Sequence, residues 1–263
     1  MWSNLIIPLL AVLIAAGVQP TPIPVPQILE GETRALRVQI SHKDKLSESQ
    51  KLTLGSAAKQ VETLAHWEGE GAGRRLIYTR KELLNNGCIA EHVFTFLPGY
   101  KLRMKNAKKT ITSPSGKAIQ TEFYDFTDPV MKYPSVLAHP FTLELAFRTF
   151  DFTPGSRRAF NIWLNPAAIL RMETVTKGIE EIELPGGKKM KCYRIDMSPN
   201  LTADFGALAN RLLKPLIPDY IFWVSVDGMH PVVKYSGPMG QISPVGAPNE
   251  VHELLSYNPG KGG

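Results

Sequence analysis

The chain has 263 residues, of which 43% are hydrophobic and 21% charged. These proportions exclude a wholly disordered or collagen-like chain and allow a sizeable core. The 30 Lys and Arg residues outnumber the 24 Asp and Glu residues, and the net charge of +6 favours an anionic partner, such as a phospholipid or another anionic envelope surface. Because the basic residues occur in scattered pairs, a solvated basic surface is the alternative. Nothing in the sequence supports binding to nucleic acid.

The first feature along the chain is an uncharged apolar segment at residues 5–18. It is shorter than the roughly 20 residues that cross a bilayer, and it ends in small residues, as a signal-peptidase site requires. We therefore expect residues 1–18 to be a signal peptide, and the protein to be exported and soluble in the periplasm. Since no Lys or Arg precedes Leu5, an uncleaved inner-membrane anchor is the alternative. No Cys comes directly after the segment, so we expect no anchoring through an acylated cysteine.

Prolines at positions 20, 22, 24 and 26 follow. They block helix formation and favour an extended linker over residues 19–29. We expect a single folded β domain over residues 30–258 and a flexible tail at 259–263.

Turn signals divide the folded part into strand-like segments. The strongest is Asn86-Gly87, because both residues tolerate the positive φ angles of a tight hairpin between residues 75–84 and 88–97. Three further hairpins are predicted. A Ser-Pro-Ser-Gly turn joins residues 101–112 to 117–126, a Pro-Gly turn joins 178–184 to 188–197, and an Asp-Gly turn joins 220–226 to 230–237. A last strand at residues 252–257 closes the sheet. Consecutive hairpins indicate an antiparallel sheet.

Helices are the exception in this sequence. The best candidate covers residues 202–216, because apolar residues recur at helical spacing and Thr202 can cap the start. Packing on the sheet is the expected role of this helix, and a lid or membrane contact is the alternative; the candidate lid residues are Phe205, Leu208, Leu212 and Leu213. A second helix is predicted within residues 47–62.

No catalytic or metal-binding pattern is present. There is no G-x-S-x-G elbow, and the six histidines have no metal-ligand spacing. Cys88 and His92 would lie about 13 Å apart in a strand, which is too far for a nucleophile and its base. We therefore predict no catalytic residue, no metal site and no cofactor, with an unrecognised hydrolase as the least favoured reading.

The two cysteines, Cys88 and Cys192, form a candidate disulfide in an oxidising compartment. Two separate thiols are the alternative, because geometry and not spacing decides whether they pair.

Aromatic residues are frequent in the strand-like segments. Most are expected in the core, but a strongly curved sheet could also leave an apolar cavity for a lipid-like molecule. The residues concerned are Phe94, Phe96, Tyr100, Phe123, Tyr124, Phe126, Phe160, Trp163, Tyr193, Tyr220, Phe222 and Trp223.

The C-terminal half reads IELPGGKKMKCYRIDM and, after the predicted helix, DYIFWVSVDGMHPVVKYSGPMG. This succession resembles bacterial envelope proteins of a domain-of-unknown-function family that looks related to the lipoprotein carriers LolA and LolB and to the stress sensor RseB. The resemblance covers about residues 75–257. It implies a mainly β fold, an antiparallel unclosed β-barrel of about ten strands with one or two helices packed across the concave face.

The sequence is compatible with three functions. The first is a non-enzymatic periplasmic protein that binds a lipid, a lipoprotein or another amphiphile in a half-barrel cavity. The second is a structural or protein-interaction component of the cell envelope without a small ligand. The third is the unrecognised hydrolase. The oligomeric state stays open.

Overall fold

The fold is described from a computed structural model. The residues that this structure describes are Pro24, Pro26, Ile28 and residues 30–40, 54–97, 102–127, 138–165, 168–200, 220–238 and 249–260. Their strands are β1 (Glu32–Ile40), β2 (Ala58–Glu68), β3 (Arg75–Leu84), β4 (Ile89–Leu97), β5 (Arg103–Thr112), β6 (Ala118–Asp125), β7 (Arg157–Asn165), β8 (Ala168–Leu184), β9 (Lys188–Pro199), β10 (Tyr220–Ser225), β11 (Val232–Pro238) and β12 (Asn249–Asn258). The helical elements in these ranges are the 3-10 turns η2 (Leu54–Ser56), η3 (Gly71–Gly73) and η4 (Pro140–Thr142), and the short α-helix α3 (Leu143–Phe147).

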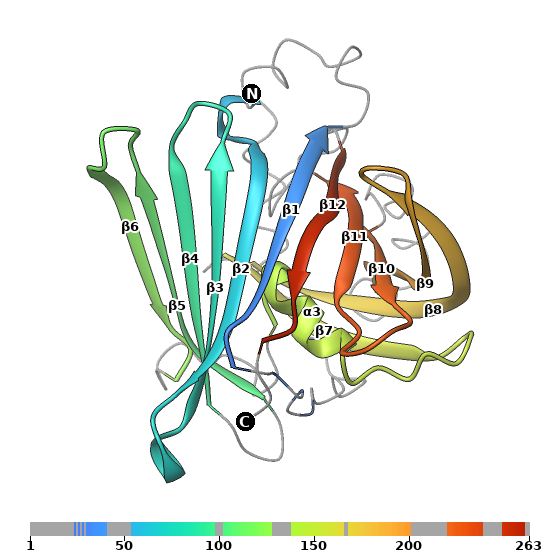
Figure 1. The fold of residues 1–263 in the computed structure, drawn as a ribbon. Helices are drawn as coiled ribbons and strands as arrows, with labels where there is room; N and C mark the ends of the chain where they lie inside the picture. The colour runs from blue at the N-terminus through green and yellow to red at the C-terminus, as the bar shows by residue number, and fades with distance from the viewer. Residues whose placement is uncertain are drawn as a thin grey trace, which may run out of the picture.

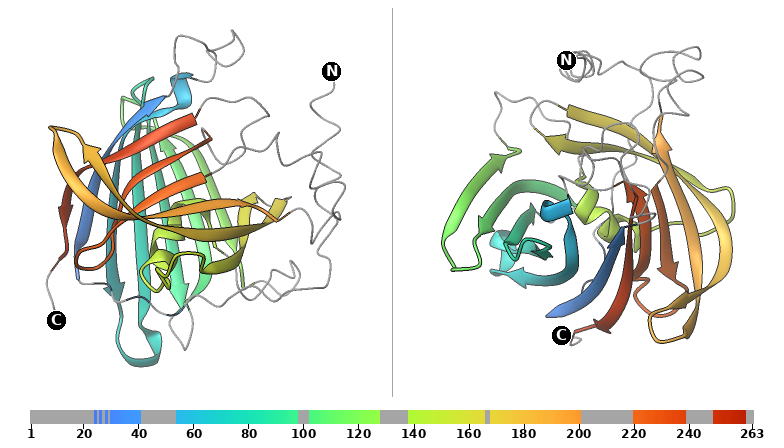
Figure 2. Two further views of the ribbon diagram at one scale, coloured as in Figure 1. Left: turned by 90° about the vertical axis from the view of Figure 1, so that its right-hand side faces the viewer. Right: turned by 90° about the horizontal axis from the view of Figure 1, so that it is seen from above.

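All twelve strands belong to one sheet, in the order β6-β5-β4-β3-β2-β1-β12-β11-β10-β9-β8-β7. Every paired neighbour is antiparallel. The strands β6 and β7 stand at the two ends of this order and do not pair with each other, so the sheet curves without closing (Figures 1 and 2). The predicted unclosed antiparallel β-barrel is confirmed, with twelve strands rather than about ten.

The predicted hairpins are confirmed. β3 and β4 meet at Asn86-Gly87, where Gly87 has a φ of 83°, and β5 and β6 meet at a turn in which Gly116 has the same φ. Only glycine adopts this backbone conformation without strain, which is why these positions end strands. β8 with β9 and β10 with β11 form the other two hairpins, and β12 contains the predicted closing strand.

The closing strand β12 pairs with β1, the first strand of the sheet. This pairing lies in the middle of the strand order. It joins two arms, one made of β1–β6 and the other of β7–β12, which curve toward the same side (Figure 2).

The prediction of a helix within residues 47–62 is wrong for its described part. Residues 54–56 form the 3-10 turn η2, and strand β2 begins at Ala58. The side chains of Val61, Thr63 and Ala65 are buried at every second position, which is the period of a strand with one covered face. Pairing with β1 and β3 therefore overrode the helical propensity of this segment.

Several other predictions fall outside the described residues. They are the signal peptide or anchor at residues 1–18, most of the linker at 19–29, the helix at 202–216 with Phe205, Leu208, Leu212 and Leu213, and the last three residues of the tail.

The helix α3 lies between the two arms (Figure 2), and its buried side chains belong to the largest buried cluster. It includes Tyr78 and Phe94 from one arm and Ile195 and Phe222 from the other. Leu143, Leu145, Ala146 and Phe147 of α3 are all buried within it. A second cluster joins β1–β4 to β11, β12 and the β8–β9 hairpin, and it contains Leu36, Val61, Leu184 and Val233. The concave face is thus packed from both arms.

We predict that Leu145→Ala lowers the free energy of unfolding by about 2–5 kcal/mol, because Leu145 is 1% exposed and its truncation leaves a cavity. Leu255→Ala is the matched control. Leu255 is 51% exposed, and its truncation should change the free energy of unfolding by less than about 0.5 kcal/mol. Urea titrations followed by circular dichroism measure both values. Equal losses in the two variants would show that α3 is not part of the core.

Candidate functional site

A continuous row of polar side chains crosses one arm of the sheet, one residue per strand. Directly paired residues lie side by side on the same face of a sheet. From β1 to β6 the paired residues are Arg34, Thr63, Arg80, His92, Lys109 and Glu122. We call these six residues the polar row. Its first four residues are buried and its last two, Lys109 and Glu122, are half-buried.

Apolar rows flank the polar row on both sides. One apolar row is displaced from the polar row by two residues along each strand. It consists of Ala65, Tyr78, Phe94 and Ala107, which belong to the large cluster. On the other side lie Leu36, Val61 and Ala90 of the second cluster, with Glu82 between them. The polar row therefore separates the two apolar clusters on the concave face.

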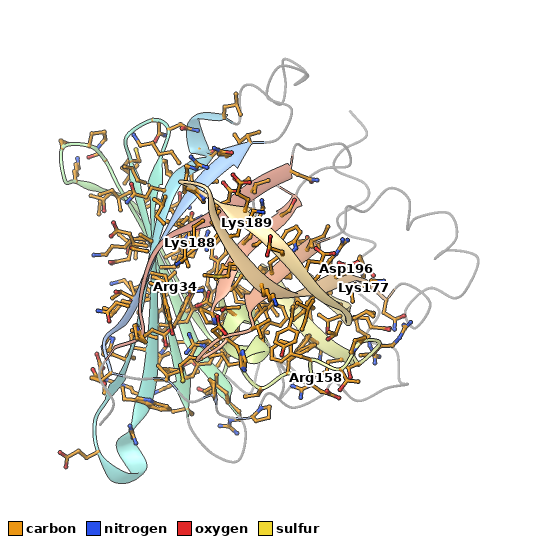
Figure 3. The ribbon with its side chains drawn as sticks, turned by 45° about the vertical axis from the view of Figure 1, so that its right-hand side comes forward. Arg34, Arg158, Lys177, Lys188, Lys189 and Asp196 are labelled. Carbon is orange, nitrogen blue, oxygen red and sulfur yellow. The ribbon has the colours of Figure 1, made fainter. Side chains whose placement is uncertain are left out.

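Arg34 anchors one end of the row. Its guanidinium forms a salt bridge with Glu144 of α3, and it donates hydrogen bonds to Thr63 Oγ1 at 3.2 Å and Tyr78 Oη at 3.3 Å. Burial disfavours the charge on Arg34, but Glu144, Tyr78 and Glu32 together outweigh this effect, and the pKa of Arg34 is raised. A buried cation with this many partners stays charged and fixes the position of α3. Figure 3 shows Arg34 on its strand.

A second ion pair ties the end of α3 to the same strand. Arg148 donates two hydrogen bonds to the carboxylate of Glu32, one of them 2.6 Å from Nη1 to Oε2. Both side chains are almost fully buried. Because Glu32 and Arg34 are two residues apart on β1, they face the same side and hold the two ends of the helix.

Arg80 and His92 at the centre of the row form a triad with Glu82, which lies beside the row on β3. Arg80 Nε donates to Glu82 Oε1 at 2.7 Å, and His92 Nε2 lies 3.8 Å from Glu82 Oε2. Burial would raise the pKa of Glu82, but its charged neighbours, Arg80 first among them, lower it, so this carboxylate is charged. Burial also lowers the pKa of His92 to about 4, although Glu82 opposes that shift. His92 is therefore neutral near pH 7.

The segment before α3 crosses from one edge of the sheet to this triad. Ala138 forms a parallel bridge with Ile162 of β7, and the Trp163 backbone N–H donates to the Ala138 carbonyl at 2.8 Å. Three residues later, the ring of Phe141 lies 4.1 Å from the Arg80 guanidinium and 4.9 Å from the His92 ring. We call residues 138–150 the plug, because they run from β7 through η4 and α3 across the concave face.

An aromatic cluster lies where the two edge strands approach each other. The ring of Trp163 on β7 lies 4.8 Å from that of Tyr124 on β6 and 5.1 Å from that of Phe126. His139 of the plug lies 5.5 Å from Trp163 and 4.6 Å from Phe94. Side chains thus bridge the seam between β6 and β7, which no backbone pairing closes.

Trp163 has an unsatisfied donor. Its side chain is buried, yet its indole Nε1 has no hydrogen-bond partner among the residues that the structure describes. Tyr124 and Phe126 beside it are only half-buried. A buried N–H group without an acceptor is rare and marks a place where a water molecule or ligand can bind.

Lys109 supplies a positive charge close to this cluster. It is half-buried on the concave side of β5, and it forms no ion pair within the described part of the chain. Glu122, its neighbour in the polar row, instead accepts hydrogen bonds from Gln120 and, at 2.9 Å, from Tyr124 Oη. The charge of Lys109 reaches His92 and His139, where it helps to lower both pKa values after the larger effect of burial.

The two cysteines of the candidate disulfide, Cys88 and Cys192, are both free in this structure. Cys192 lies on β9 and Cys88 directly before β4, so they come from different arms of the sheet. Both belong to or pack against the second cluster. Burial, with a smaller contribution from Asp227, raises the pKa of Cys192 to about 12.

The basic pairs seen in the sequence are spread over the molecule. Lys188 and Lys189 lie at the tip of the β8–β9 hairpin, and Lys189 pairs with Glu181 at 3.3 Å (Figure 3). Arg75 pairs with Glu68 on β2. The described basic pairs therefore form no single cationic patch.

The described histidines do not gather into a metal site, and no group of three or more potential metal ligands occurs in this part of the chain. His252 contacts Glu250 at 3.0 Å, and His66 contacts Glu68 at 3.2 Å. His230 sits at the turn after β10, where its φ of 53° makes it unusual for a residue other than glycine. As for membrane-spanning helices, the described elements include none of sufficient length and apolarity.

The fold and its interior define the class of this protein: an unclosed antiparallel β-barrel whose concave face carries a polar row between apolar clusters. No protein-family model and no curated protein matches the chain. Among solved structures, it is similar to a beta-barrel-like protein of domain of unknown function DUF1849 from Brucella abortus. The two chains share 7% sequence identity with a TM-score of 0.43, and the match covers 88% of this chain and 98% of that one.

Sequence reasoning missed the polar row. Its members come from six strands, so no local spacing connects them. One signal is present in β1, where Glu32 and Arg34 lie at alternate positions on the same face as the apolar Leu36 and Val38, and the residues between them are more exposed. Charged residues on the apolar side of a strand indicate buried ion pairs.

We predict that stability falls as the pH falls from 6.5 to 4, because the unfolded chain binds a proton at His92 that the folded protein does not bind. His92→Gln removes this difference and should reduce the loss of unfolding free energy over that range by up to about 3 kcal/mol. Denaturant titrations at several pH values measure it. Parallel curves for the wild type and the variant would contradict a buried neutral His92.

We also predict that iodoacetamide labels Cys88 in the folded protein at least about tenfold faster than Cys192, because Cys192 is buried and its thiol pKa is about 12. Mass spectrometry of the peptides measures both rates. After unfolding without a reductant, two labels should be found. A chain that takes up labels only after reduction would show that the cysteines pair.

Proposed function

We propose that this protein is a non-enzymatic component of the cell envelope that binds an anionic amphiphile at the seam between β6 and β7. The observation that carries the proposal is the unsatisfied indole N–H of Trp163, which is buried within the aromatic cluster at this seam. The predicted export signal would deliver the protein to a compartment rich in such molecules.

An amphiphile would supply the acceptor that Trp163 lacks. A buried donor without a partner costs about 1–3 kcal/mol, so binding a carboxylate or phosphate oxygen there recovers this energy. A neutral hydrocarbon would not. The unsatisfied N–H therefore favours a ligand with an oxygen-containing headgroup.

The charge of the headgroup follows from Lys109. This ammonium lies on the same face as His92 and close enough to His139 to affect its pKa, and His139 contacts the Trp163 ring. His92 and His139 are neutral, because burial lowers both pKa values. Lys109 forms no salt bridge among the described residues, although Glu122 lies opposite it on β6, and its ammonium group favours an anion over a neutral or cationic headgroup.

Partly exposed aromatic side chains at the site can contact the apolar part of the ligand. Tyr124, Phe126 and Phe141 are half-buried and lie around Trp163 and His92. Burying apolar surface contributes about 25 cal/mol per Å² of area. We propose that a single acyl chain packs against these rings. The proposal includes a relation to the lipoprotein carriers that the sequence resembles.

The test uses oleate as a probe and two adjacent lysines as a matched pair. Lys109 faces the concave side, while Lys108 on the same strand is exposed and pairs with Phe123 on the other face. Oleate should raise the melting temperature of the wild type. Lys109→Met and Trp163→Phe should each weaken oleate binding about tenfold, whereas Lys108→Met should change it less than about twofold.

Native mass spectrometry of protein purified from its own envelope is the second measurement, and an anionic amphiphile should co-purify. The proposal fails if none co-purifies and oleate leaves the melting temperature unchanged. It also fails if the two lysine substitutions weaken binding equally, because the headgroup would then not lie on the concave face.

A second candidate function is a partner-binding envelope component with no small ligand. It is favoured by the plug, since Leu143, Leu145, Ala146 and Phe147 place the protein's own side chains in the middle of the concave face. Failure of the oleate experiment would support this candidate.

A further inference from the structure

We infer that Arg171 binds the headgroup of the proposed ligand through two oxygen atoms at once, so that this headgroup is a carboxylate or a phosphate. The inference rests on the proposed function, because it assigns a further residue to the same site. Arg171 lies on β8, which pairs with β7 on the side away from the seam.

Arg171 is a buried cation that forms no salt bridge within the described part of the chain. It is 9% exposed, and its Nε and Nη2 atoms are both buried without a hydrogen-bond partner. No other side chain among the described residues leaves two buried polar atoms unsatisfied. A buried charge is costly unless an opposite charge or hydrogen bonds compensate it, so this side chain indicates a place where an anion binds.

Other arginines with buried side chains show how this protein compensates such a charge. Each of the following three forms a salt bridge with a carboxylate: Arg34 with Glu144, Arg80 with Glu82, and Arg148 with Glu32. Arg171 differs from them in this respect. The carboxylate that it lacks is a group that a ligand can supply.

An acidic side chain two residues away from Arg171 is already occupied. Glu173 lies on the same strand and therefore on the same face as Arg171. One oxygen of its carboxylate accepts a hydrogen bond from Arg157, and the other accepts one from Asn200 Nδ2 at 3.2 Å. Glu173 is thus engaged by other donors, and the charge of Arg171 stays available for a ligand.

The two unsatisfied atoms of Arg171 fit a group with two oxygens. Nε and Nη2 lie on one edge of the planar guanidinium, and their N–H groups form a fork. Arg194 of this protein uses the same two atoms to bind Asp196: Nε donates to Oδ1 at 2.7 Å and Nη2 donates to Oδ2 at 3.4 Å. Carboxylates and phosphates match this fork, whereas an alcohol offers only one oxygen. The unsatisfied edge therefore selects the chemical class of the headgroup.

Arg171 and Trp163 present their unsatisfied donors on the same face of the β7–β8 hairpin. Trp163 pairs with Ile169 and Asn161 pairs with Arg171, and the register is regular between these two pairs. Arg171 and Trp163 are therefore diagonal neighbours, which lie about 7–8 Å apart, within reach of long and aromatic side chains. One headgroup can thus accept hydrogen bonds from both the guanidinium and the indole.

The test compares three probes that share one oleyl chain: oleate, oleyl phosphate and oleyl alcohol. By calorimetric titration, the wild type should bind at least one of the two anions about tenfold more tightly than the alcohol. The anion that binds more tightly identifies the source of the two oxygens, a carboxylate or a phosphate.

Arg171→Met should reduce this preference for the anion at least about fivefold, because it removes the fork. Arg171→Lys should lose most of the preference too, since it keeps the charge but not the paired donors. The matched control is Lys177→Met, which removes a positive charge from the same strand. The Lys177 side chain is 51% exposed, and the variant should change the preference less than about twofold.

A second measurement needs no ligand. Arg171→Met removes a buried charge that has no partner, so this variant should melt at a higher temperature than the wild type when both are freed of bound amphiphile. Arg80→Met provides the contrast, because it leaves the carboxylate of Glu82 buried without its partner and should melt at a lower temperature.

The results separate this inference from the proposed function. If neither anion binds to the wild type, the proposed function fails and the inference fails with it. If an anion binds but Arg171→Met keeps the wild-type preference, only the assignment of Arg171 is overturned. The same holds if Arg171→Met melts at a lower temperature than the wild type without a probe, because the guanidinium would then have a partner within the protein.

Discussion

The pair of salt bridges between α3 and β1 is the interaction on which the interior depends. Arg34 binds Glu144 and Arg148 binds Glu32, so one strand holds a helix of five residues at both ends. A helix this short is unstable by itself, and it persists because its ends are fixed and its side chains are buried. Removing one member of either pair would leave a buried charge without a partner, which is far more costly than losing the contact itself.

The polar row follows from the same constraint. A sheet that curves strongly around a small interior brings residues of many strands together, and here it brings together charges that compensate one another: Arg80 with Glu82 beside His92, and Arg34 with Glu144. The row divides the apolar interior into two clusters. Among the described residues, the indole N–H of Trp163 is one of several buried polar atoms that have no hydrogen-bond partner in this arrangement.

Much of the fold was predictable from the sequence, because hairpin turns are local. Gly87 after Asn86, and Gly186 and Gly187 of the Pro-Gly-Gly turn, specify their strands through positive φ angles that few other residues adopt. The prediction of a helix within residues 47–62 is wrong for its described part, because β2 forms hydrogen bonds with strands on both sides, and these stabilise the strand more than a local helical propensity stabilises a helix. The candidate site was beyond sequence reasoning. Trp163 was recognised only as one aromatic residue among many, and its relation to Lys109 depends on contacts between strands and a plug that are distant in the chain.

The pairing of β1 with β12 has a consequence for how the chain matures. The two arms are built from neighbouring hairpins and can form as each segment appears, but the sheet is joined only when the last strand meets the first, more than 200 residues away. Contacts between such distant segments form late, because closing the long loop is costly. A chain that crosses a membrane during synthesis would therefore remain open along its middle until its C-terminal strand had followed, and it could pass through a narrow translocation channel without first having to unfold a finished sheet.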